Sequence, residues 1–270
     1  MITENSNGKN VADTINAIEP SEGIGGGLVK LRVGTYNIGH FALGKSPGSS
    51  VNNNTLAAWV AKYHSAMNDA GFDVLCAQEY EPDIVSGKPT KDYVFENFKY
   101  NGISNKVLYN CNAIFSNVKM AQAVIVNFRA NQSGRNYIYT TIKLGGHDVK
   151  IVTSHLDFDG QSIRQSQINQ IINAFANDDY VIWCGDFNIF AGYEADWDII
   201  RNAGYTMANM GYAGEFITAP YVPPGSGTLV NYKLDNICVK GFAISEVKTF
   251  GTLEMSDHYG LQATLTMLES

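Results

Sequence analysis

Short apolar segments, bounded by glycine and polar residues, recur along much of the chain in the way that is typical of β-strands. The clearest segment spans residues 181–188, where Val-Ile-Trp-Cys is followed by Gly185, Asp186, Phe187 and Asn188. A short apolar run that ends at a glycine predicts a buried strand with a turn behind it. Because a strand is rigid, it holds a carboxylate at its end in a fixed position.

Other short apolar or alternating segments predict further strands. They cover residues 29–38, 73–79, 111–116, 121–128, 137–144, 149–155, 234–239, 243–250 and 259–267. Ser116-Asn117 and Gly145-Gly146 predict turns that join neighbouring strands into hairpins. Two prolines and mixed aromatic and polar residues indicate an irregular excursion over 82–102. A glycine- and proline-rich loop is expected after Gly204 and up to Ser226.

Three segments carry helix signals. Residues 55–70 place apolar side chains on one face and end before Gly71. Ser162 and Gln165 have the spacing of a capping box and predict a helix that leads to Phe175. A third helix is expected over 194–203. Strand hairpins mixed with helical crossovers predict an α/β fold with mixed sheets.

Composition indicates one globular domain behind a short leader. With 45% hydrophobic and 17% charged residues, the chain is too apolar for a disordered protein. Residues 1–30 are polar and then glycine-rich, which indicates a leader or tether, and no linker divides residues 31–270. Four widely spaced cysteines lie inside apolar segments, and we interpret them as buried free thiols.

The net charge of -7 argues against tight binding of nucleic acid through a broad basic surface. An acidic chain can still bind phosphate through a divalent cation. The sequence has no signal peptide and no apolar run long enough to span a membrane. We therefore expect a soluble monomer without stable membrane insertion, and these features assign no compartment.

Polar residues recur where the predicted strands end. They are Asn37, Glu79, Asn112, His155, Asp186 with Asn188, Asp235, and Asp257 with His258. Taken singly, each has a structural explanation, such as a hydrogen-bonded core histidine, a strand-end cap or a turn. Taken together, they suggest one polar site assembled from many strand ends.

Seven short motifs carry these residues in a single order. They are Thr-Tyr-Asn-Ile (35–38), Gln-Glu (78–79), Asn-Ala-Ile (112–114), Ser-His-Leu (154–156), Gly-Asp-Phe-Asn (185–188), Leu-Asp-Asn-Ile (234–237) and Ser-Asp-His (256–258). This order resembles the endonuclease/exonuclease/phosphatase superfamily, which includes deoxyribonuclease I, neutral sphingomyelinases and inositol polyphosphate 5-phosphatases. The resemblance covers about residues 31–268. It implies a deoxyribonuclease I-like α/β fold, a four-layer sandwich of two packed mixed β-sheets flanked by helices.

The resemblance also implies a metal-dependent phosphoester hydrolase. A phosphoester repels nucleophiles, so its hydrolysis needs a hard cation with oxygen ligands, a positioned water and cationic donors. By this resemblance, Glu79, Asn37 and Asp257 would bind Mg²⁺, with Mn²⁺ as a substitute. Asp186, with Asn188, would align or deprotonate the attacking water. His155 and His258 would donate to the phosphate, and Asp235 would orient His258. Asn112 and Arg135 are the expected substrate contacts.

Two departures from the family pattern bear on substrate and mechanism. The carboxylate that supports the first histidine in the deoxyribonuclease branch is unassigned between Glu81 and Glu96. The apurinic-site endonucleases usually carry tyrosine where this chain has His155, which disfavours abasic-DNA repair. The leading hypothesis is a phosphodiesterase acting on nucleic acid. A phosphatase or phospholipase C-type enzyme acting on a lipid or inositol headgroup is the alternative, and a catalytically silent binding module is the second.

Overall fold

The computed structural model describes residues 28–41, 56–83, 89–92, 94–105, 111–130, 134–209, 216–222 and 227–269. Most of the leader predicted over residues 1–30 lies outside this described part. Within the described residues, no helix has both the length and the apolar character needed to cross a membrane.

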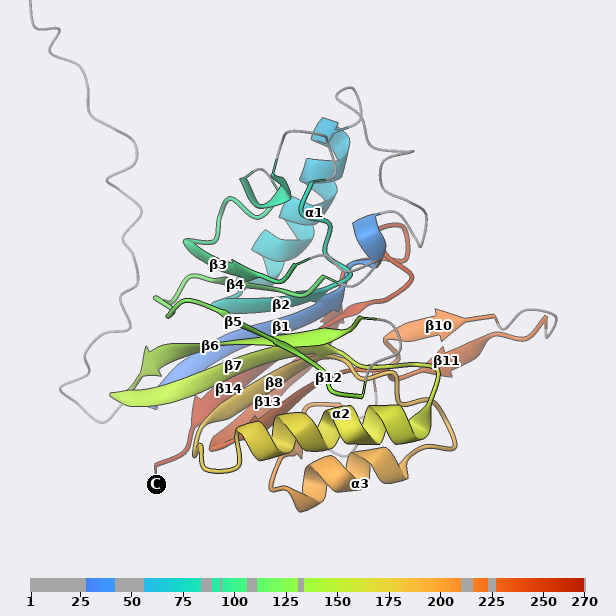
Figure 1. Ribbon diagram of the computed structural model, residues 1–270. Helices are drawn as coiled ribbons and strands as arrows, with labels where there is room; N and C mark the ends of the chain where they lie inside the picture. The colour runs from blue at the N-terminus through green and yellow to red at the C-terminus, as the bar shows by residue number, and fades with distance from the viewer. Residues whose placement is uncertain are drawn as a thin grey trace, which may run out of the picture.

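Two six-stranded sheets pack face to face (Figure 1). The first sheet consists, in spatial order, of β13 (Phe242–Phe250), β14 (Gly260–Met267), β1 (Lys30–Asn37), β2 (Val74–Gln78), β4 (Ala113–Ser116) and β3 (Tyr100–Ile103). The second consists of β5 (Val124–Asn127), β6 (Asn136–Leu144), β7 (His147–His155), β8 (Val181–Asp186), β12 (Asp235–Lys240) and β9 (Thr206–Met207). Each sheet is mixed, because β1 pairs with β2 and β7 with β8 in parallel while the other neighbours are antiparallel.

Helices cover the outer face of each sheet (Figure 1). On the first sheet, α1 (Leu56–Ala70) packs Tyr63 and Met67 against the outward side chains of β1, β2 and β4. On the second, α2 (Gln161–Ala174) and α3 (Ala195–Asn202) contribute Ile168, Ile171 and Trp197 to a cluster with the outward side chains of β7 and β8. The predicted four-layer α/β sandwich is thereby confirmed.

The remaining elements are short. A two-stranded ribbon, β10 (Ala219–Tyr221) with β11 (Val230–Tyr232), projects beside the sandwich (Figure 1). Single 3-10 turns occur at η2 (Gly39–Phe41) and η4 (Thr90–Asp92). The apolar layer between the sheets includes Cys76 and Cys184, and all four cysteines are buried and free, as the sequence predicts.

Three local predictions are wrong. Strands β4 and β5 do not form a hairpin, because β4 ends in the first sheet and the chain crosses to the second sheet before β5. Strand β3 begins inside the irregular excursion predicted over 82–102; only Gly102 of its four residues is buried, and the strand has no apolar alternation. Strands β9 and β10 likewise lie in the segment predicted as a loop, and each is too short to show a period.

The predicted capping box is also wrong. Helix α2 begins at Gln161 and its N-cap is Gly160, which makes no side-chain capping bond. Ser162 therefore lies inside the first helical turn. A buried ion pair instead fixes this helix to α3, because Nε of the buried Arg164 donates to Asp196 at 2.8 Å.

Removing the carboxylate of Asp196 is expected to destabilise the fold strongly. Gln161 and Gln165 also donate to this carboxylate, so Asp196→Ala would leave a buried guanidinium and two amides without their acceptor. The expected loss is about 3–5 kcal/mol in the free energy of unfolding, measured by urea denaturation. Asp198→Ala, which removes an exposed partner of Arg201 on the same helix, is the matched control and should leave stability nearly unchanged. Equal effects of the two substitutions would contradict the assignment.

Candidate active site

The candidate site lies between the two sheets, where the inward-facing positions of the central strands change from apolar to polar. Inward positions recur every second residue, so the strand period decides which side chains meet. In chain order the series are Leu31, Val33, Thr35 and Asn37; Val74, Cys76 and Gln78; Val149, Ile151, Thr153 and His155; Ile182, Cys184 and Asp186; and Asp235, Ile237 and Val239. Parallel pairs end at the same edge, and antiparallel β12 starts there, so the polar residues converge.

A buried hydrogen bond ties the two sheets together next to this site. Gln78 Nε2 donates to Thr153 Oγ1 at 2.9 Å, and Thr35 Oγ1 donates to Gln78 Oε1 at 3.4 Å. All three residues are fully buried. The site therefore rests on a hydrogen-bonded layer that fixes the spacing between the sheets.

Asp186 is the centre of the site. Its strand partners in register are His155 on one side and Asp235 on the other. Its Oδ2 is approached by Asn37 Nδ2 at 3.1 Å, His155 Nε2 at 3.4 Å and His258 Nε2 at 3.8 Å. Its Oδ1 accepts the backbone N–H of Asn188 at 2.9 Å. One carboxylate oxygen thus faces three donor groups at once.

The Gly-Asp-Phe-Asn motif has a steric reason for its glycine. A Cβ placed on Gly185 would lie 2.0 Å from the Ser154 carbonyl oxygen on β7, so no side chain fits there. Asn188 follows in a left-handed conformation, with φ of 50°, and its Nδ2 donates to the Leu156 carbonyl oxygen at 2.8 Å. The motif therefore holds the loops after β7 and β8 together.

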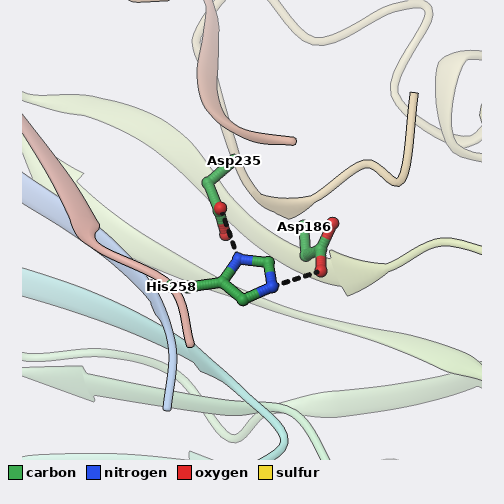
Figure 2. A group of neighbouring side chains, drawn as sticks. All are labelled: Asp186, Asp235 and His258. Atoms are coloured by element: carbon green, nitrogen blue, oxygen red, sulfur yellow. Dashed lines mark hydrogen bonds and ion pairs between the residues drawn. The ribbon is translucent and has the colours of Figure 1, made fainter. Parts of the chain in front are cut away.

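His258 joins Asp186 to Asp235 (Figure 2). Its Nδ1 lies 2.7 Å from Asp235 Oδ2, and its Nε2 points toward Asp186. The backbone N–H of Asp235 donates to Thr218 Oγ1 at 3.0 Å, and that of His258 donates to Ser256 Oγ at 3.2 Å. The pairing of Asp235 with His258 that the sequence suggested is therefore present, and backbone contacts fix both partners.

The pKa values of the ionisable groups in this cluster are shifted in different directions. Burial, together with the charge of Asp235, raises the pKa of Asp186 to about 6. Burial alone would lower the pKa of His258, but the carboxylates of Asp235, Asp186 and Asp257 outweigh it and raise that pKa to about 10. Burial, with the charges of Arg135, His258 and His40, holds the pKa of His155 well below its usual range. At neutral pH one imidazole is thus cationic and the other neutral.

Glu79 and His40 form a second cluster beside Asn37. His40 Nε2 lies 3.2 Å from Glu79 Oε2, and its Nδ1 lies 3.4 Å from Glu81 Oε2. Asn37 Nδ2 lies 3.3 Å from Glu79 Oε1, so Asn37 links this cluster to Asp186. Both His40 and Glu79 have positive φ, a strained backbone for these residues that often marks functional sites.

On its Nδ1 side His155 faces Glu79, whose Oε1 lies 3.9 Å from that nitrogen. The sequence left this role open between Glu81 and Glu96. Glu81 pairs with His40, and Glu96 is exposed. His40 itself was missed as a site residue, and the signal for it was its position three residues after Asn37, the polar end of β1.

The other predicted site residues lie around the two clusters. Asp257 is exposed, and its Oδ1 accepts from Ser256 Oγ at 3.4 Å. Asn112 is buried and donates to the backbone and side chain of Asn136 rather than to the Asp186 cluster. Arg135 is only 4% exposed, and its Nη1 donates to the His155 carbonyl oxygen at 3.2 Å.

Two neighbouring sets of side chains offer ligands for a metal ion. Asp186, Asp235 and His258 each provide one atom within 4.8 Å of the others. Asn37, Glu79 and Asp257 carry hard oxygen donors, and Asn37 connects the other two: its Nδ2 lies 3.3 Å from Glu79 Oε1, and its Oδ1 accepts at 3.1 Å from the N–H of Gly39, whose missing Cβ would lie 3.2 Å from Asp257 Oδ1. Only oxygen donors make up the second set, which is the chemistry that Mg²⁺ prefers.

Solved structures share this fold at low sequence identity. D. rerio TDP2 complexed with single strand DNA product is 17% identical, with a TM-score of 0.67, over 87% of this chain and 98% of that one. The endonuclease/exonuclease/phosphatase from Beutenbergia cavernae DSM 12333 is 16% identical, with a TM-score of 0.64, over 89% and 72%. The endonuclease/exonuclease/phosphatase family protein from Leptotrichia buccalis C-1013-b is 18% identical, with a TM-score of 0.65, over 87% and 99%.

No curated protein sequence matches the chain. The model of the Endonuclease/Exonuclease/phosphatase family, by contrast, matches residues 34–258, which span the site from β1 to His258. Members of this family are generally hydrolases that act on phosphoesters and typically use a divalent metal. The chain belongs to the Endonuclease/Exonuclease/phosphatase family.

Proposed function

We propose that this chain is a Mg²⁺-dependent phosphodiesterase that hydrolyses nucleic acid by attack of water. The observation that carries the proposal is the environment of Asp186 Oδ2, which faces Asn37, His155 and His258 at 3.1, 3.4 and 3.8 Å. A carboxylate oxygen surrounded by donors can receive a proton from water while the donors bind phosphate oxygens.

The protonation states support this division of roles. With a pKa of about 6, Asp186 is ionised at neutral pH and can accept the proton of the attacking water. His258, whose pKa is about 10, is cationic and can donate from Nε2 to the phosphate, while Asp235 holds its Nδ1. Asn188 aligns Asp186 through its backbone N–H, and His155 supplies a second donor.

Glu79, Asn37 and Asp257 are the residues that would hold the metal. When bound, a divalent cation neutralises phosphate charge and polarises the phosphoryl group. The Asp186, Asp235 and His258 set suits this role less well, because His258 Nδ1 is already committed to Asp235. His40 fits a positioning role, since it orients Glu79 through one ring nitrogen and faces Glu81 through the other.

Nucleic acid is the proposed substrate class. The D. rerio TDP2 structure, which shares the fold, is complexed with single strand DNA product. Asn112 and Arg135 are proposed to position the substrate, Arg135 through the His155 backbone that it contacts. The alternative is a lipid or inositol headgroup. The second alternative, a catalytically silent binding module, is disfavoured by the presence of Asp186, Asp235 and His258 together.

A substrate panel tests the proposal. Purified protein with Mg²⁺ or Mn²⁺ is incubated with single-stranded DNA, duplex DNA, RNA, sphingomyelin, inositol polyphosphates and simple phosphomonoesters. We expect a nucleic acid to be cleaved fastest. Turnover of sphingomyelin or an inositol phosphate with nucleic acids left intact would promote the first alternative. Metal binding without turnover of any substrate would favour the binding module.

Nucleic-acid affinity should respond only weakly to salt. The slope of log affinity against log salt counts the phosphates that a protein neutralises, and a chain of net charge -7 offers few cations for this purpose. Fluorescence anisotropy of a labelled oligonucleotide in increasing KCl measures the slope. A steep slope, of the kind produced by six or more phosphate contacts, would contradict this expectation.

Glu79→Gln is expected to weaken Mg²⁺ binding without unfolding the protein. The substitution keeps the shape of the side chain but removes the charge that a hard cation requires. Calorimetric titration with Mg²⁺ measures the loss of affinity, and thermal melting checks the fold. Glu254→Gln, at an exposed glutamate paired with Lys62, is the matched control. Full hydrolysis by the wild-type protein in EDTA would refute the metal requirement.

A further inference from the structure

The loop after β7 presents an exposed aromatic ring beside the candidate active site. Phe158 is 52% exposed and lies three residues after His155. The backbone on either side of it is firmly held: the N–H of Asp157 donates to Gln167 Oε1 at 2.8 Å, and the carbonyl of Asp157 accepts from Arg164 Nη1 at 3.3 Å. The N–H of Asp159 donates to Asp157 Oδ1 at 2.9 Å. A large apolar ring is thus displayed to solvent on a fixed support.

Arg135 connects this ring to the site. Its Cζ lies 5.5 Å from the centre of the Phe158 ring, within the range of a cation–π contact, while its Nη1 donates to the His155 carbonyl oxygen. Burial lowers the pKa of Arg135, and the carboxylates of Asp186, Asp157, Glu79 and Asp159 oppose that shift. The guanidinium therefore contacts Phe158 from the protein side, and about half of the residue remains open to solvent.

An acidic nucleic-acid enzyme needs binding energy that does not depend on phosphate contacts. With a net charge of -7, the chain cannot draw that energy from a broad basic surface. Stacking of a base on an aromatic ring supplies energy independent of phosphate charge, and every base has a face that can stack. Asp157 and Asp159 flank Phe158 in the sequence, and negative charge so close along the chain disfavours a phosphate at the ring.

We propose that Phe158 is a stacking platform that holds one nucleobase of the substrate next to the reacting phosphodiester. This inference rests on the proposed function and adds to it a specificity-determining residue. It commits the site to a substrate that carries an unpaired base beside the scissile bond. A fixed ring loses little conformational freedom on binding, so the support described above favours such a role.

The test compares a dithymidine phosphodiester with two analogues, each of which lacks one of its two bases. Phe158→Ala is expected to raise KM for the dithymidine substrate about 5- to 100-fold, with little change in kcat. For the analogue without the stacked base, wild type and variant should have similar KM values. Phe158→Trp should restore the wild-type KM. Leu268→Ala removes a similarly exposed apolar side chain after the far end of β14 and should change nothing.

A binding assay separates this inference from the proposed function. Affinity for a short fluorescein-labelled oligothymidylate is measured in EDTA, where metal-dependent cleavage is absent, and Phe158→Ala should weaken it by a similar factor. If the wild type binds the oligothymidylate more tightly than the variant and yet cleaves no nucleic acid, that result would support Phe158 as a stacking platform and would refute the proposed hydrolysis.

Other outcomes overturn the platform. Unchanged affinity and KM in Phe158→Ala would leave the proposed function intact and remove Phe158 from it. If Phe158→Ala raised KM equally for both base-deficient analogues, the ring would not stack on a base and would instead act by positioning Arg135 and His155. Binding of wild type, but not the variant, to phosphatidylserine vesicles without nucleic-acid binding would assign the ring to a lipid surface and would refute both proposals.

Discussion

Asp186→Asn is expected to lower kcat by about 10²- to 10⁴-fold while substrate affinity changes little. The amide cannot accept a proton from water, yet it has nearly the same shape as the carboxylate. Its oxygen can still accept the N–H of Asn188, which lies 2.9 Å from Asp186 Oδ1. Steady-state kinetics on the preferred nucleic-acid substrate, with binding measured separately, would resolve the effect on kcat from the effect on affinity.

The matched control for this change is Asp148→Asn. Asp148 lies near the start of β7, at the opposite end of the strand from His155, and forms an exposed pair with Lys143. It undergoes the same chemical change far from the site and should keep full activity. A thermal melt of each variant checks that the fold is retained. An unaltered kcat in Asp186→Asn would remove Asp186 from the proposed mechanism.

The architecture could be predicted because two independent signals agree. The apolar runs of β2 and β8 and the alternation in β1 indicate strands, and the order of the short motifs indicates how such strands assemble. The prediction failed where the apolar pattern was weak. Strand β3 buries only one of its four residues, and β4 and β5 share a turn-like connection although they belong to different sheets. Local pattern shows that a strand exists but not which neighbour it pairs with.

The candidate site could be predicted in part for the same reason. Polar ends of strands identified Asp186, His155 and Asp235, and the register of β7, β8 and β12 places them in one row. The partners that come from connecting segments were not foreseen. Thr218, which precedes β10, accepts the N–H of Asp235, and His40 bridges Glu79 and Glu81. Such contacts depend on long-range packing, which leaves no period in the sequence.

The same limit applies to Arg135. Its position just before a predicted strand suggested a contact with substrate phosphate, and the structure places it almost fully buried, with Nη1 on the His155 carbonyl oxygen. A single sequence does not reveal whether a charged side chain points outward or into the protein. Phe158, one of many aromatic residues in the sequence, becomes informative only when its exposure and its contact with Arg135 are known.

Asp235 and His258 are expected to act as a single unit, so that the double variant is little worse than the worse single variant. Asp235 Oδ2 lies 2.7 Å from His258 Nδ1, and this carboxylate both fixes the ring and raises its pKa to about 10.

Asp235→Asn should therefore cost about 10²- to 10⁴-fold in kcat, because the imidazole loses its preferred protonation state and its orientation toward Asp186. His258→Gln should cost a similar factor, because the donor itself is removed. Once the imidazole is absent, the carboxylate has nothing left to orient, so the two losses overlap instead of multiplying.

The measurement is kcat for the wild type, both single variants and the double variant on one substrate. Thermal melting of each variant checks that loss of the buried pair has not unfolded the protein. Losses that multiply fully would show that Asp235 and His258 contribute independently, and the geometry of Figure 2 would then describe a structural contact rather than a catalytic one.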